Sequence, residues 1–125
     1  MPQPKSPLKP VLRLVLAVII LACTAWVARS YWVKRQLIVA ENQAVELQNQ
    51  QQYAQACAAY EALLPRTRGE QAQRLRHNAA LCYAAMAEEP SLNLSDSLEL
   101  YRKACSLDPA TVSNPAILRR LEKTN

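Results

Sequence analysis

The first third of the chain and the rest carry different hydrophobic patterns. Residues 14–28 (LVLAVIILACTAWVA) form an uncharged run between Arg13 and Arg29. At a rise of 1.5 Å per residue this run covers only about 22 Å, and the hydrocarbon core of a bilayer is about 30 Å thick. Residues 11–33 reach that thickness when the two arginines extend toward the interfaces. The pattern predicts one transmembrane helix over residues 11–33, after a basic, proline-rich tail at residues 1–10.

Beyond this segment, the apolar residues of the sequence recur at helical spacing. Prolines 65, 90, 109 and 115 separate the stripes, and helices usually end before or begin at a proline. The stripes are Leu37, Ala40, Ala44 and Leu47; Tyr53, Ala56, Cys57, Tyr60, Leu63 and Leu64; Leu75, Ala79, Cys82, Tyr83 and Met86; Leu94, Leu98, Tyr101, Ala104 and Cys105; and Ile117, Leu118 and Leu121. We expect a helix for each stripe, with the first continuous with the transmembrane helix, in an all-α domain over residues 37–123.

Polar residues mark the expected helix starts. Thr67 with Glu70 three residues later has the pattern of a capping box. Ser95 is the expected N-cap of the fourth stripe, and Asn114 followed by Pro115 predicts the start of the last helix.

Composition and charge narrow the function. One glycine and no phenylalanine in 125 residues, with many Ala, Leu and Gln, favour helices over strands. Residues 1–35 hold six of the fifteen Lys and Arg and no acid, whereas residues 36–125 hold nine Lys and Arg and ten Asp and Glu. The folded part is therefore close to neutral, and we expect no nucleic-acid partner.

Cys23 gives the N-terminal segment a second interpretation. The apolar stretch 14–22 and the sequence Ile20-Leu21-Ala22-Cys23 resemble a bacterial lipoprotein signal peptide. That resemblance implies cleavage before Cys23 and lipidation of its side chain. A lipoprotein normally continues into a polar tether, whereas residues 24–28 and 31–33 prolong the apolar helix here. An uncleaved signal anchor, a lipoprotein and a cleaved signal peptide all stay open.

Two of the expected helices share a pattern. Tyr53-x2-Ala56-x3-Tyr60 recurs loosely as Ser97-x3-Tyr101-x2-Ala104-x4-Pro109. This resembles the second helix of a tetratricopeptide repeat (TPR), in which a small residue admits a neighbouring helix and an aromatic residue fills the gap to the next repeat. The pairs Ala80 with Tyr83 and Ala44 with Leu47 fall on the corresponding positions of the preceding helices. The tryptophan and leucine positions of the family are not kept.

The resemblance covers residues 37–109 as two degenerate repeats, with residues 114–123 as a capping helix. In the TPR family, the first helices of the repeats line a groove that binds a peptide or a partner helix. The resemblance implies that the corresponding groove positions in this chain are Glu41, Val45, Gln48, Arg74, His77, Asn78 and Ala84. Glu41 and Val45 replace the basic and amide residues of the carboxylate clamp found in chaperone adaptors, so we do not expect recognition of a C-terminal carboxylate. An ordinary solvated helix face is the alternative.

The cysteines and the single histidine are the candidates for a disulfide, a metal site or a catalytic site. The repeat geometry that the resemblance implies places Cys57 and Cys82 at facing depths, where a disulfide would stabilise the fold by ~3 kcal/mol. Alternatively, Cys57, Cys82 and Cys105 are buried free thiols that act as small hydrophobic residues. His77 is the only histidine and Gly69 the only glycine. We therefore expect no catalytic site, metal or cofactor.

Together these features predict a membrane-anchored, non-catalytic TPR-like adaptor that binds other proteins in a bacterial envelope assembly. A short basic N-terminal tail usually stays in the cytoplasm, which favours a single-pass inner-membrane protein with a periplasmic domain. The alternative is an envelope lipoprotein lipidated at Cys23 and similar in outline to the TPR pilotins. Stable arrays usually need about three repeats, so we expect the domain to be stabilised by the membrane, by a partner or by a second copy of itself.

Overall fold

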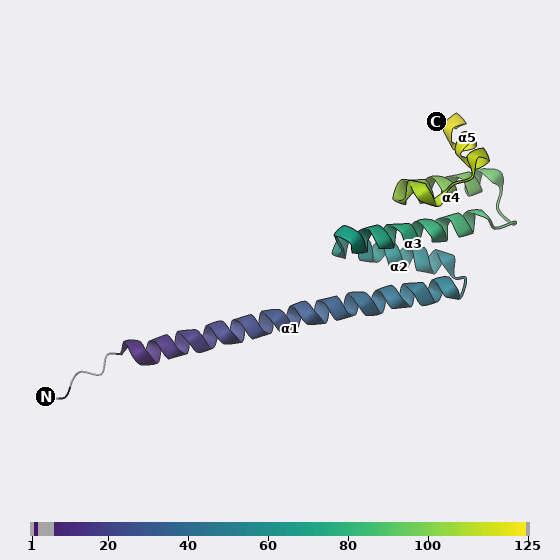
Figure 1. Ribbon diagram of the computed structural model, residues 1–125. Coiled ribbons are helices and arrows are strands. Elements are labelled where there is room, and N and C mark those ends of the chain that lie inside the picture. The colour runs from purple at the N-terminus through teal and green to yellow at the C-terminus, as the bar shows by residue number, and fades with distance from the viewer. Residues whose placement is uncertain (1, 3–6, 125) are drawn as a thin grey trace. The chain divides into compact units, whose positions relative to one another are not determined.

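The computed structural model describes residue 2 and residues 7–124, and these residues form an all-helical chain without strands (Figure 1). The five α-helices and two short 3-10 helices of these residues are α1 (Leu8–Asn49), α2 (Tyr53–Leu63), η1 (Leu64–Arg66), α3 (Gly69–Ala87), α4 (Leu94–Leu107), η2 (Pro109–Thr111) and α5 (Pro115–Lys123). The predicted all-α class is confirmed. The chain separates into two compact units between Gln36 and Leu37.

The first unit contains the N-terminal part of α1. Of the predicted tail at residues 1–10, residues 1 and 3–6 lie outside the described residues, while residues 8–10 already belong to α1. Pro10 is accommodated because the first turn of a helix needs no donor from its N–H groups. The apolar window of α1 is long enough to span a membrane, and none of it is buried within the structure. The helix predicted over residues 11–33 is present, and it continues without a break to Asn49.

The second unit begins with a core shared by residues 37–49 of α1, α2 and α3. Three alanines in this core, Ala44, Ala56 and Ala79, are fully buried, one from each helix. Small side chains let helix backbones approach closely, as ridges of one helix enter grooves of the next. Tyr60, Leu75 and Cys82 are the largest fully buried side chains of the domain. The core is therefore thin and is built mainly from small residues.

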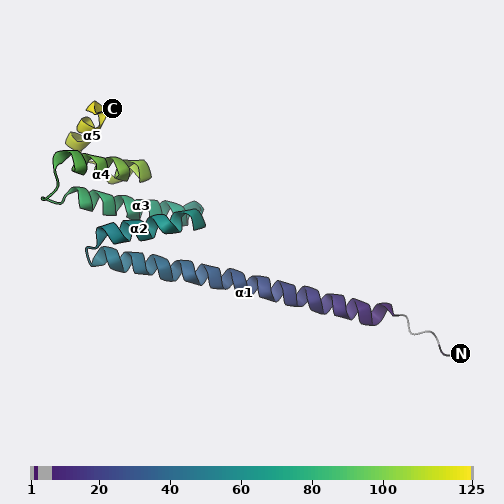
Figure 2. The ribbon, with the colours of Figure 1, turned by 180° about the vertical axis from the view of Figure 1, so that it is seen from behind.

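A second core joins α3 to α4 and to the segment that follows. Ala80, Ala104 and Val112 are buried in it, and Tyr101 and Ile117 pack against them. Figures 1 and 2 show α2, α3 and α4 lying side by side from both directions, with α5 beyond α4. Ile117 brings α5 into this core, in agreement with the apolar stripe predicted for the last helix.

Two of the predicted helix starts are wrong in detail. Thr67 does not cap α3, because its hydroxyl donates to the carbonyl oxygens of Leu63 and Leu64 at distances of 3.3 and 3.1 Å. The N-cap of α3 is Arg68, which makes no side-chain capping bond. The N-cap of α4 is Asn93 rather than Ser95, and its Oδ1 accepts from the N–H of Asp96 at 2.8 Å. At α3, the Thr67 hydroxyl is engaged by the end of the preceding helices instead. At α4, Asn93 and Ser95 are both short polar residues near the start, and the backbone conformation selects between them.

The remaining helix ends follow local rules. Asn114 caps α5 with Pro115 at the first helical position, as predicted. α1 ends in a Schellman motif, in which Gln51 takes a φ of 61° and the N–H of Gln52 donates to the carbonyl of Leu47 at 2.9 Å. Gly69 also has a φ of 61°, with no atom near the position a Cβ would occupy, so backbone conformation rather than space favours glycine there.

Candidate partner-binding surfaces

The predicted groove positions on α1 and α3 are partly brought together. Arg74 Nε lies 2.8 Å from Glu41 Oε1, and Arg74 Nη2 lies 3.3 Å from Glu41 Oε2. The Glu41 side chain is only 13% exposed, whereas that of Arg74 is 57% exposed. Gln71 Nε2 also donates to Glu41, at 3.4 Å. The hydrogen bond from the Arg74 guanidinium holds the pKa of the Glu41 carboxyl below its ordinary value. This pair links α1 to α3 at the edge of the first core.

The next groove positions along α1 are less available for a polar contact. Gln48 accepts a 2.8 Å hydrogen bond from the buried Tyr60 of α2, so its amide oxygen is engaged inside the domain. Burial raises the pKa of the Tyr60 hydroxyl to about 12, so it remains a donor at neutral pH. Val45 is 38% exposed, and Asn78 of α3 is half-buried. Of the groove positions predicted on α1, Val45 is therefore the one whose side chain is exposed and unpaired.

His77 and Ala84 lie toward the other side of α3. His77 Nδ1 is 2.6 Å from Asp108 Oδ2, at the junction of α4 and η2. Asp108 also caps η2 through the N–H of Ala110, and the hydrogen bond from His77 holds the pKa of its carboxyl below the ordinary value. Ala84 packs against the core between α3 and α4. Of the seven predicted groove residues, Glu41 and Arg74 are the pair joined by side-chain hydrogen bonds.

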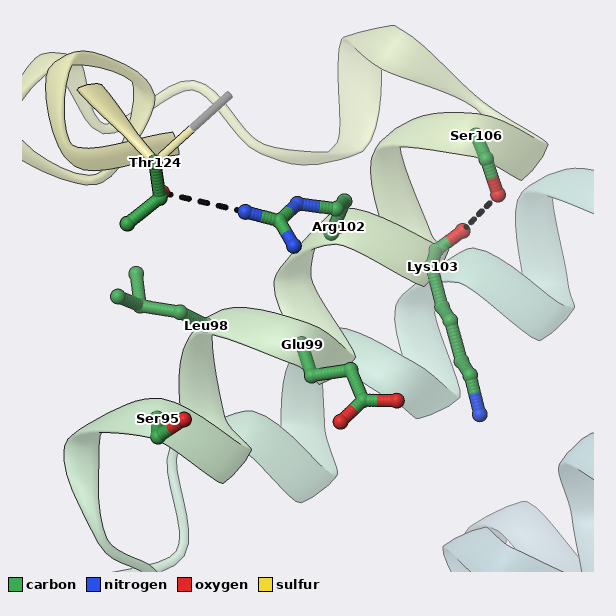
Figure 3. Close-up of a pocket in the computed structure, with 7 residues that line it drawn as sticks. All are labelled: Ser95, Leu98, Glu99, Arg102, Lys103, Ser106 and Thr124. Carbon is green, nitrogen blue, oxygen red and sulfur yellow. Dashed lines mark hydrogen bonds between the residues drawn. The ribbon is translucent and has the colours of Figure 1, made fainter. Parts of the chain in front are cut away.

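A surface that the sequence analysis did not single out lies on α4. A hollow of about 520 Å³ follows this helix, and Thr124, which follows α5, also lines it (Figure 3). Arg102 Nη2 donates to Thr124 Oγ1 at 3.1 Å, and this bond joins α4 to the C-terminal segment. The α4 residues that line the hollow recur every three or four positions along one helix face. They are Ser95, Leu98, Glu99, Arg102, Lys103 and Ser106.

That periodicity was available in the sequence. Apart from Leu98, which belongs to the predicted apolar stripe of this helix, the lining residues of α4 have the pattern of an ordinary solvated helix face. What the pattern could not reveal is the position of Thr124, because that depends on the turn between α4 and α5. The hollow combines apolar surface from Leu98 with charges of both signs, which suits a mixed polar and apolar protein segment better than a strongly charged ligand.

A polar contact also links three helices on the surface. Tyr83 of α3 donates to Glu61 Oε1 of α2 at 2.6 Å, and Lys103 Nζ of α4 lies 5.8 Å from the centre of the Tyr83 ring. Burial and the hydrogen bond to Glu61 raise the pKa of the Tyr83 hydroxyl. A cation over an aromatic face contributes about 0.5–1 kcal/mol at an exposed site. Tyr83 therefore reinforces the stacking of α2, α3 and α4.

The four cysteines occupy three kinds of environment, and all four are free thiols in the structure. Cys57 and Cys82 are buried in the first core, and Cys105 packs at the edge of the second. Cys23 is exposed in the middle of α1, with helix on both sides of it. The predicted lipidation of Cys23 and the predicted disulfide between Cys57 and Cys82 stay predictions.

The described residues include no group of three or more His, Cys, Asp or Glu side chains placed to hold a metal ion. His77 contacts the carboxylate of Asp108. Cys57 and Cys82 are buried in the first core, away from this pair. The chain matches no protein-family model, and no curated protein or solved structure is significantly similar to it.

Proposed function

We propose that this protein is a membrane-anchored adaptor whose helical domain binds another protein in a bacterial envelope assembly. The observation that carries the proposal is the contrast along α1. Its apolar window has no partner within the structure, whereas residues 37–49 of the same helix join a packed core. A long, fully exposed apolar run is stable in a bilayer and costly in water.

The flanking residues fit an uncleaved anchor. Trp26, Tyr31 and Trp32 are exposed on α1, where aromatic side chains favour the membrane interface. Lys34 and Arg35 follow them and suit the headgroup region. Cys23 lies inside a continuous helix, and this supports the anchor over a lipoprotein, which would begin at that residue with a flexible tether. We place the domain in the periplasm, on the basis of the short basic N-terminal tail.

The form of the domain supports a binding role. Successive antiparallel helices with fully buried alanines at their crossings are what a TPR-like array requires, and we propose that arrangement as two degenerate repeats closed by α5. Val45 is exposed one helical turn after Glu41, and Arg74 of the Glu41–Arg74 pair is also exposed. Together these residues form a surface of apolar and charged side chains on α1 and α3. We propose that this surface, which we call the α1–α3 face, receives a peptide segment or helix of the partner.

A photo-crosslinking amino acid tests this assignment in intact cells. Placed at Val45, it should yield a discrete adduct with one partner protein, because the side chain is exposed on the α1–α3 face. The same amino acid at Arg102 tests the hollow on α4, and Ala58 on the exposed side of α2 is the matched control. Adducts at Arg102 alone would move the binding surface to α4. Equal labelling at all three positions, or none at any, would contradict an adaptor role.

Mass spectrometry of the mature N-terminus separates the two forms of anchor. The proposed signal anchor retains residues 1–22, whereas a lipoprotein begins with a diacylated Cys23. Detection of the lipidated form would overturn the single-pass topology and leave the binding role to be judged by the crosslinks.

A further inference from the structure

The first core contains two buried sulfur atoms on neighbouring antiparallel helices. Cys57 of α2 is 3% exposed and Cys82 of α3 is fully buried. The Cys57 Sγ lies 3.7 Å from the carbonyl oxygen of Ala79. Ala79 is one helical turn before Cys82 on α3, so the Cys57 sulfur is already positioned beside the turn that carries its counterpart.

The direction of helical side chains brings the second sulfur to the same place. The Cα–Cβ bonds of a helix tilt toward its N-terminus, so a side chain lies over the turn that precedes it. The Cys82 side chain therefore lies over the turn of Ala79, where the Cys57 sulfur is found. Both sulfurs belong to the same cluster of buried residues between α2 and α3.

We infer that Cys57 and Cys82 form a reversible disulfide that joins α2 to α3 across the first core. In the reaction, the thiolate of one cysteine attacks the disulfide of an oxidant, breaks its S–S bond and forms a mixed disulfide. The second thiolate then attacks that sulfur, which forms the Cys57–Cys82 bond and releases the oxidant as two thiols. Two electrons and two hydrogens pass from the cysteines to the oxidant, which is a protein disulfide of the oxidising compartment or glutathione disulfide.

The composition of the core explains what such a bond would do. Alanines occupy the helix crossings, and only Tyr60, Leu75 and Cys82 are large and fully buried. A domain of this size with so little buried volume gains proportionally more from a covalent link than a larger domain would. The bond closes a loop of about 25 residues, so its loss should reduce the ratio of folded to unfolded protein about 100-fold.

Burial of the pair also sets its kinetics. Neither sulfur is accessible to an oxidant once α2 and α3 have packed, so the bond forms during folding or during local opening of the domain. Once formed, it is protected from small reductants by the same packing. Cys105, at the edge of the second core, is partly exposed and has no cysteine beside it.

Thiol counting on the full-length chain tests the proposal independently of any partner or compartment. The reduced protein is unfolded in guanidinium chloride and returned to mild detergent in a glutathione redox buffer. After denaturation with maleimide present, we expect two reactive thiols of the four in the sequence, and four after reduction. Peptide mass spectrometry should identify the bond as Cys57–Cys82, and guanidinium unfolding should show the expected 100-fold change on reduction.

Two variants serve as matched controls. Cys82→Ala should leave three reactive thiols before and after reduction, whereas Cys105→Ala should leave one before and three after. Four free thiols in the refolded wild type, a bond that includes Cys105, or glutathione adducts on Cys57 would each overturn the proposal. The peptide map of the wild type decides the question even if the alanine variants fold poorly, and none of these outcomes depends on the adaptor role.

Discussion

The two parts of α1 are equally helical but have opposite surroundings. Residues 11–33 are apolar on every side, and each large apolar side chain among them is exposed. Residues 37–49 bury one stripe of apolar residues, whose Ala44 is fully buried against α2 and α3, while Ile38, Val39 and Val45 stay exposed. Helix propensity does not distinguish these segments. The angular distribution of the apolar residues around the helix distinguishes them. A stripe on one face can be buried by two neighbouring helices, whereas apolar residues around the whole circumference of a helix require a surrounding apolar medium.

The largest expected effect comes from placing charge in the first part. Ile19→Asp with Ile20→Asp should abolish membrane insertion, because each charge near the centre of a membrane helix costs about 2.5–3.5 kcal/mol on insertion scales. Ile38→Asp with Val39→Asp is the matched control, since these side chains are 56% and 49% exposed and those of Ile19 and Ile20 are 52% and 57% exposed. Alkaline extraction of membranes followed by immunoblotting measures the difference.

The control should remain in the membrane fraction, because residues 38 and 39 lie outside the predicted span. Loss of both variants from the membrane would show that the membrane-inserted part of α1 extends beyond residue 33 to residues 38 and 39. Retention of both would remove the basis for an anchor over residues 11–33.

The second contrast is between two tyrosines on opposite sides of this division. Tyr60 is fully buried, whereas Tyr31 is 69% exposed. Tyr60→Ala should destabilise the domain by about 3–5 kcal/mol, through lost burial and the cavity that remains. Small domains have only about 5 kcal/mol of stability, so this variant should be largely unfolded. Circular dichroism melting in detergent checks the result, and Tyr31→Ala should melt like the wild type.

A milder variant separates the ring from its hydroxyl. Tyr60→Phe keeps the packing and loses the 2.8 Å bond to Gln48, which should cost about 0.5–1.5 kcal/mol. If Tyr60→Ala and Tyr60→Phe melted together, the hydroxyl and not the thin core would dominate the stability of the first core.

The caps of α4 give an intermediate effect. Asn93→Ala should destabilise the domain by about 1 kcal/mol, because the N–H of Asp96 loses its acceptor. Ser95→Ala, at the residue expected from the sequence to be the cap, should change the stability by less than about 0.5 kcal/mol. Chemical unfolding in detergent compares the two variants. A larger loss of stability for Ser95→Ala than for Asn93→Ala would mean that Ser95 is the N-cap of α4, as predicted from the sequence.

The caps also show where sequence reasoning stops. Periodicity identified Ala44, Tyr60, Cys82 and Ala104 as core residues, because the spacing of apolar residues encodes which face of a helix is buried. The choice between Asn93 and Ser95 depends on which of them takes an extended backbone conformation, and local sequence leaves that open.

The candidate surfaces were less predictable for a different reason. Glu41 and Arg74 were both expected on the groove, but their mutual contact follows from the register of α1 against α3. His77 and Asp108 are 31 residues apart in sequence, and only the packing of α3 against the end of α4 brings them together. Pairings between distant residues depend on tertiary packing, which a one-dimensional pattern does not encode.

The smallest expected effect is at the Glu41–Arg74 pair, which joins the second part of α1 to α3. Because Arg74 is 57% exposed, the pair should contribute about 0.2–1 kcal/mol. A double-mutant cycle of Glu41→Gln and Arg74→Gln, followed by urea unfolding in detergent, measures this coupling energy. Both substitutions keep a hydrogen-bonding amide, so the cycle isolates the charge interaction.

The coupling should depend on pH in a defined direction. Arg74 holds the pKa of Glu41 in the folded protein below its value of about 4.3 in the unfolded chain. The stabilisation is therefore fully present above pH ~4.3 and is lost as the pH falls through the lower folded value. Measured at pH 7 and again near pH ~3, the coupling energy should shrink toward zero. A coupling that persisted in acid would mean that the contact between α1 and α3 acts through packing of the Arg74 stem and not through charge.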